Sequence, residues 1–125
     1  MKLLLDSHAV YWWLGGGGKL SYRARELIRD RSNTVLVSAV SIYEIELKAY
    51  RRRIDLPPRE LRAALSRNQV GELAISSDHA EYAANLDWEH RDPWDRLLFA
   101  QAILEGCGLV SVDAVFDQVP VTRHW

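Results

Sequence analysis

The chain contains one cysteine in 125 residues, so an intramolecular disulfide is excluded and a reducing compartment is expected. It also lacks a hydrophobic run long enough to span a membrane or to serve as a signal peptide, because Asp6 and His8 interrupt the apolar start. We therefore expect a protein without membrane attachment that resides in the cytoplasm.

An excess of charge of either sign is missing as well. The 16 Lys and Arg residues against 17 Asp and Glu residues leave a formal net charge of −1, which provides no overall basic field for nucleic acid. Such contact would have to be local, for example through the arginines at 51–53, although a solvated helix face is the simpler interpretation of that triplet. With 48% hydrophobic residues the chain is not a disordered polymer, and its length fits a single domain over residues 1–125.

Short apolar segments alternate along the chain with segments of helical periodicity. Strands are expected at 2–5, 34–37, 72–75, 109–112 and 119–122, and helices at 9–14, 21–31, 40–52, 57–67, 78–85 and 93–105. This alternation predicts an α/β fold, a single-domain α/β/α sandwich with a central parallel sheet.

The stretch HRDPWDRLLFAQA, residues 90–102, places two aspartates around a proline before an apolar run. Asp92 suits the N-cap, Pro93 suits the first helical position, and Asp95 complements the helix dipole in the first turn. Taken alone, this stretch is explained by helix initiation. A further role for Asp95 depends on where the other acids lie.

Three other acids come where predicted strands end or where the following helix begins. Asp6 follows the first strand, Asp113 follows the strand near 109–112, and Glu44 lies early in the helix after the second strand. Because the carboxyl ends of parallel strands form the ligand crevice of such sheets, we expect Asp6, Glu44, Asp95 and Asp113 to meet at one edge. Taken singly, each is explained equally well as a turn or surface acid.

Four carboxylates at one edge repel each other, and two of them ~4 Å apart would cost about 4 kcal/mol at an effective dielectric near 20. A hard divalent cation such as Mg²⁺ or Mn²⁺ removes this repulsion, because it prefers oxygen ligands. Such a site suits phosphoryl chemistry. In this hypothesis Asp6 and Asp95 bind the cation directly, and Glu44 and Asp113 bind it directly or through water.

In order and spacing, four segments resemble the sequence blocks of PIN-domain ribonucleases, and within them the VapC-like toxins of toxin–antitoxin pairs. The segments are LLLDSHAVYWWL, SAVSIYEIELK, HRDPWDRLLFAQA and GLVSVDAVF, and the likeness spans residues 2 to 121. The resemblance implies an endoribonuclease that depends on Mg²⁺ or Mn²⁺, with its acids at Asp6, Glu44, Asp95 and Asp113. It also implies an RNA substrate, a homodimer and a small antitoxin protein that blocks the active site.

Several neighbours of these acids differ from the family pattern or have an open role. The family commonly carries Thr where Ser7 and Ser111 stand, and both serines keep a hydroxyl that can hold a carboxylate or a water, or can simply cap a turn. Trp94 stands where relatives often have Phe. Arg96 could neutralise a carboxylate, touch the scissile phosphate, or form a surface salt bridge. His8 and His90 could be metal ligands or proton shuttles, but an ordinary polar residue is the expectation for both, because hard cations do not favour imidazole.

Other functions were weighed against this hypothesis. A phosphate loop in GGGGKLS is excluded because Leu20 stands where Ser or Thr must follow Lys19, and the glycines predict a turn. An aspartyl-phosphate phosphohydrolase of the haloacid-dehalogenase type wants a second Asp where His8 stands. A PIN-like binding module without catalysis stays open, although all four acids are present.

Overall fold

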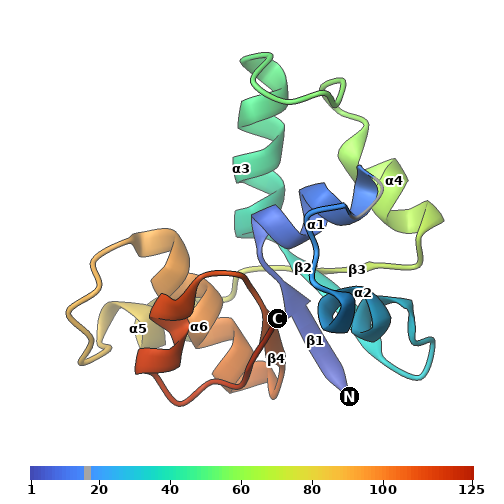
Figure 1. The fold of residues 1–125 in the computed structure, drawn as a ribbon. Helices are drawn as coiled ribbons and strands as arrows, with labels where there is room; N and C mark the ends of the chain where they lie inside the picture. Colours follow the sequence, from blue (N-terminus) through green and yellow to red (C-terminus); the bar gives the residue numbers. More distant parts are fainter. Residues whose placement is uncertain (16–17) are drawn as a thin grey trace.

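The computed structural model describes residues 1–15 and 18–125 (Figure 1). Its elements are, in chain order, β1 (Lys2–Leu5), α1 (Ser7–Leu14), α2 (Tyr22–Arg29), β2 (Thr34–Ser38), α3 (Ala39–Tyr50), α4 (Leu61–Arg67), β3 (Gly71–Leu73), α5 (Ser77–Ala84), α6 (Pro93–Glu105), β4 (Gly108–Val110), the 3₁₀ helix η1 (Ala114–Gln118) and β5 (Arg123–His124). Part of the glycine turn predicted after α1, residues 16–17, lies outside the described residues.

The five strands form one parallel sheet in the order β3-β2-β1-β4-β5, with β1 at its centre. Leu3, Leu4 and Leu5 of β1 are completely buried, because helices cover both faces of the sheet. Leu3 and Leu5 face a core shared with α1 to α4, whereas Leu4 faces a core shared with α6 and η1. The predicted α/β/α sandwich is therefore confirmed.

The last part of the chain differs from the prediction, which placed a strand at 119–122. Residues Ala114–Gln118 form η1 instead, with Phe116 buried in the second core, and the final strand is Arg123–His124. Pro120 lies within the predicted strand and has no N–H for the ladder, so pairing with β4 begins only beyond it.

The start of α5 also differs. Ser76 caps this helix rather than Asp78, because its hydroxyl accepts from the His79 N–H while the His79 ring accepts from the Ser76 N–H. Among the described helices, none has both the length and the apolar character that crossing a bilayer requires.

Candidate functional site

Asp6 lies at the carboxyl end of the central strand. Its N–H donates to the Val110 carbonyl at 3.1 Å, and its Oδ1 accepts the Ala9 N–H at 2.8 Å as the N-cap of α1. The Ser111 hydroxyl, next to it at the end of β4, also hydrogen-bonds to this carboxyl. With only 7% of its surface exposed, Asp6 is held in one position by the sheet and the helix together.

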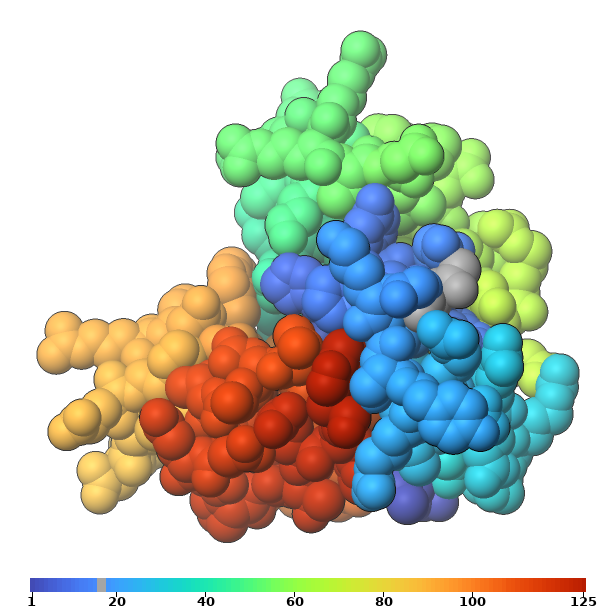
Figure 2. Space-filling model, in the orientation of Figure 1, coloured from blue at the N-terminus to red at the C-terminus, as the bar shows by residue number. Residues whose placement is uncertain are grey.

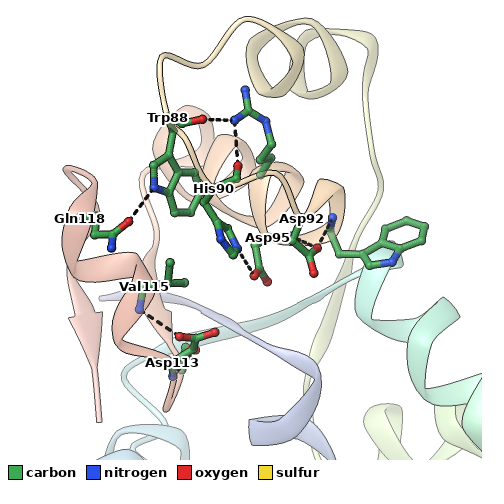
Figure 3. A network of polar contacts seen from close by, with 10 residues as sticks. Trp88, His90, Asp92, Asp95, Asp113, Val115 and Gln118 are labelled. Carbon is green, nitrogen blue, oxygen red and sulfur yellow. Dashed lines mark hydrogen bonds and ion pairs between the residues drawn. The ribbon is translucent and has the colours of Figure 1, made fainter.

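Asp113 reaches the same edge from the segment that follows β4. Its N–H donates to Ser111 Oγ at 3.0 Å, and its Oδ1 accepts the Val115 N–H at 3.0 Å at the start of η1. In Figure 3 its carboxyl group and that of Asp95 point toward each other. Asp113 is exposed, so it lies at the outer side of the site.

Glu44 comes from α3, where it is half-buried between the exposed Tyr43 and the buried Ile45. Ser7, at the start of α1, donates a long hydrogen bond of 3.5 Å from its hydroxyl to Glu44 Oε2. Ser7 and Ser111 thus each contact a carboxyl group of the predicted set, Ser7 that of Glu44 and Ser111 that of Asp6.

Asp95 lies in the first turn of α6, and the local helix-start interpretation of this stretch is confirmed. Asp92 is the N-cap, accepting from the N–H groups of Trp94 at 2.9 Å and Asp95 at 3.2 Å, with Pro93 in the first turn. The Asp95 side chain has a different partner, because His90 Nε2 lies 2.7 Å from its Oδ2 (Figure 3). The two aspartates therefore serve different purposes.

His90 is the side chain that contacts Asp95, and sequence reasoning considered it only as a metal ligand, a proton shuttle or an ordinary polar residue. Its imidazole packs against Trp88 with ring centroids 4.8 Å apart, and Trp88 Nε1 donates to Gln118 Oε1 at 3.1 Å. The ring is thereby held against Asp95, which the expectation of an ordinary polar residue did not foresee. The sequence signal was weak: a single histidine shortly before an acid, in a segment without periodicity.

Arg96 points away from the acids. Its guanidinium donates to four backbone carbonyls, those of Ala83, Leu86, Trp88 and His90, at 2.7 to 3.1 Å. The sequence suggested that Arg96 pairs with a carboxylate, contacts a phosphate or forms a surface ion pair. The structure shows it bound to backbone carbonyls instead. Arg96 holds the loop that presents His90.

Burial and mutual repulsion raise the pKa of three of the four acids. The pKa of Asp6, of Glu44 and of Asp95 is raised, in each case chiefly because burial disfavours the charged form. Asp113 raises the pKa of both Asp6 and Asp95, while Asp6 and Asp95 raise that of Glu44. Each of the four predicted acids therefore lies within electrostatic reach of two of the others at one edge of the sheet.

The donor set fits a hard divalent cation held in an open site. Within residues 1–15 and 18–125, no three Asp, Glu, His or Cys side chains form a group that could hold a metal ion by itself. Mg²⁺ does not require such a group, because it commonly takes one or two carboxylates and keeps several waters. Burial makes the ionised form of these carboxylates unfavourable when no cation is near. A bound cation would stabilise that form, and the carboxylate oxygens would be its ligands.

The raised pKa values give an expected dependence of stability on pH. A carboxyl whose folded pKa is raised contributes stability that is full below its ordinary value, 3.8 for Asp, and is lost as the pH rises through the folded value. Asp6→Asn keeps the helix cap but cannot ionise. Without divalent ions, the variant should therefore gain stability relative to the wild type as the pH rises from acid to neutral. Thermal unfolding of both proteins across this range measures it, and a pH-independent difference would contradict it.

Comparisons with known proteins agree with the geometry. The family model described as PIN domain matches residues 3–121. Ribonuclease VapC22 of Mycobacterium tuberculosis is 34% identical to this chain over 114 residues, which cover 89% of the chain and 86% of that protein.

Two solved structures show the same fold at low identity. The chain is similar to a structure of VapBC2 from Rickettsia felis bound to a promoter DNA fragment, with a TM-score of 0.73 and 16% identity over 99% of this chain and 98% of the other. It is also similar to VapC20 of Mycobacterium tuberculosis, a sarcin–ricin loop cleaving toxin, with a TM-score of 0.64 and 18% identity over 96% of each chain. Together with the family match over residues 3–121, these findings show that the chain belongs to the PIN domain family.

Proposed function

We propose that this PIN-domain protein is a metal-dependent endoribonuclease that acts as the toxin of a toxin–antitoxin pair. The observation that carries the proposal is the arrival of Asp6, Glu44, Asp95 and Asp113 at one edge of the sheet from four separate elements. The identity of 34% to a VapC ribonuclease supports the same reaction, hydrolysis of RNA phosphodiester bonds.

Mg²⁺ or Mn²⁺ is the proposed cofactor, with Asp6 and Asp95 as direct ligands and with Glu44 and Asp113 as direct or water-mediated ones. When bound, such an ion lowers the pKa of a water and polarises the phosphate. The chain's own contribution is orientation. Asp6 is held by the Ala9 N–H and the Ser111 hydroxyl, and Asp95 is held through Oδ2 by His90. Partners that orient metal-binding carboxylates in this way commonly support both affinity and activity.

The proposed partners follow from the relatives. A toxin–antitoxin complex from Klebsiella pneumoniae has a TM-score of 0.70 to this chain at 18% identity, which supports a small antitoxin protein as the partner here. We expect the antitoxin to cover the acids, the toxin to be a homodimer, and both to act in the cytoplasm, where the RNA substrate is.

The alternatives have less support. An aspartyl-phosphate phosphohydrolase lacks its second Asp, since His8 stands two places after Asp6. A binding module without catalysis has no need of a buried Asp6 whose pKa, like that of Glu44 and that of Asp95, is raised by burial and by neighbouring acids.

The test uses the purified full chain with labelled single-stranded RNA. We expect cleavage with Mg²⁺ or Mn²⁺, no cleavage with EDTA, and recovery when the divalent ion is restored. Single-stranded DNA of the same sequence is the substrate control. Cleavage that survives EDTA would contradict the metal-dependent mechanism, and a trapped phosphate on Asp6 would support the phosphohydrolase instead.

A further inference from the structure

Two large aromatic side chains are exposed beside the acids. Tyr43 of α3 is 55% exposed and Trp94 of α6 is 38% exposed, and their ring centroids lie 5.7 Å apart at an interplanar angle of 39°. Aromatic rings of this size are ordinarily covered in folded proteins or used at interfaces. The pair joins two helices that cover different parts of the sheet, so it is a feature of the tertiary fold.

The pair lies next to the acids in sequence and in space. Tyr43 directly precedes Glu44, Trp94 directly precedes Asp95, and the charge of Asp95 raises the pKa of Glu44. The Trp94 backbone is held by the Asp92 cap at 2.9 Å, which places its ring at the start of α6. In Figure 2 the surface is indented between the lobe formed by α3 and α4 and the lobe formed by α5 and α6.

We propose that Tyr43 and Trp94 form a stacking platform for an unpaired nucleobase of the RNA, next to the phosphate that the acids process. This inference rests on the proposed nuclease function and names how the same site holds its substrate. Bases stack on aromatic side chains in single-stranded nucleic acid recognition, and the contact tolerates different sequences because every base has a π-face.

The geometry indicates where the base lies. A base sandwiched between two rings needs about 7 Å between their planes, twice a normal van der Waals contact of about 3.5 Å. The rings are too close for that at 5.7 Å, so the base stacks on the outer surface of the pair. The contact between the rings holds them in place before RNA arrives, which reduces the entropy lost on binding. In a duplex the bases already stack on each other, so the platform selects single strands.

The test measures binding separately from cleavage. A fluorescein-labelled short single-stranded RNA is titrated with the Asp6→Asn chain in Mg²⁺, a background in which the proposed function predicts cutting about a thousandfold slower than in the wild type. Adding Tyr43→Leu or Trp94→Leu should weaken binding about 5- to 150-fold, the range measured for one stacked base. Trp94→Phe should retain most of the affinity because it keeps a ring.

Two matched controls separate stacking from other effects. Tyr50→Leu removes a tyrosine from the same helix that is 77% exposed, and it should change binding little. An RNA-like probe of equal length without bases should bind the parent and the leucine variants equally.

Several results would overturn the platform: unchanged affinity in folded leucine variants, an equal loss for the probe without bases, or an equal loss with Tyr50→Leu. A fall in molecular mass in solution with Trp94→Leu would assign the pair to contact between copies instead. RNA that is cut at the wild-type rate in the Asp6→Asn background contradicts the proposed function, whereas retained binding without stacking dependence contradicts only the platform.

Discussion

Asp6→Asn is expected to lower kcat/KM for RNA cleavage about a thousandfold while the domain stays folded. Asp6 is the most buried of the four acids, and it lies at the end of the central strand, where Asp113 and Glu44 interact with it electrostatically. Loss of the proposed ligand would remove several kcal/mol of transition-state stabilisation, and about 4 kcal/mol corresponds to that factor. Cleavage rates at saturating Mg²⁺ or Mn²⁺ measure the effect.

Asparagine separates chemistry from folding at this position. Its side-chain oxygen can still accept the Ala9 N–H that caps α1, whereas Asp6→Ala also loses the cap, at a cost of about 1 kcal/mol in the free energy of unfolding. Asp30→Asn is the matched control, because Asp30 is an exposed carboxylate with hydrogen bonds to Ser32 and lies outside the site. A folded Asp6→Asn protein with wild-type activity would refute the assignment.

Arg96→Ala is expected to lower the melting temperature by about 10 °C. The guanidinium donates to four carbonyls in the segment from Ala83 to His90. The substitution removes all four of these charge-assisted hydrogen bonds at once. Water can hydrogen-bond to some of the freed carbonyls, so we expect the free energy of unfolding to fall by about 3 kcal/mol. In a domain of this size, each kcal/mol lowers the melting temperature by about 3 to 5 °C. Arg96→Lys should lose most of the same stability, because an ammonium cannot reproduce the planar fork.

Arg91→Ala is the control for Arg96, since it removes an exposed arginine from the same stretch. Thermal unfolding and cleavage rates are measured on all three variants. The Arg96 variants should also cleave RNA more slowly. Arg96 fixes the loop that holds His90 against Asp95, and this loop loses its hydrogen bonds in the variants. A melting temperature within about 2 °C of the wild type for Arg96→Ala would show that the loop does not depend on this residue.

The parts of the fold that the sequence predicted well depend on local patterns. The central strand could be predicted from its run of leucines, because both of its faces are buried. The start of α6 could be predicted from Asp92 and Pro93, because helix capping is a short-range interaction. The expectation that Asp6 and Asp113 lie at one edge followed from topology, since both come after strands that point the same way.

The parts that could not be predicted depend on contacts between distant residues. Arg96 folds back onto carbonyls up to 13 positions earlier, and nothing in the periodicity of α6 indicates that its side chain leaves the acids for the loop. His90 gains its role only through that loop. The short final strand follows η1, whose formation depends on burying Phe116 against α6 and β4.

The placement of β4 beside β1 has a consequence for synthesis. Asp6 emerges from the ribosome early, but its neighbour Ser111 and the Val110 carbonyl that anchors its backbone are translated about a hundred residues later. A nascent polypeptide therefore lacks the neighbours that fix Asp6 until the later strand has been made. Because of the order of the strands, the polypeptide around Asp6 gains its Val110 and Ser111 contacts only after β4 has been translated.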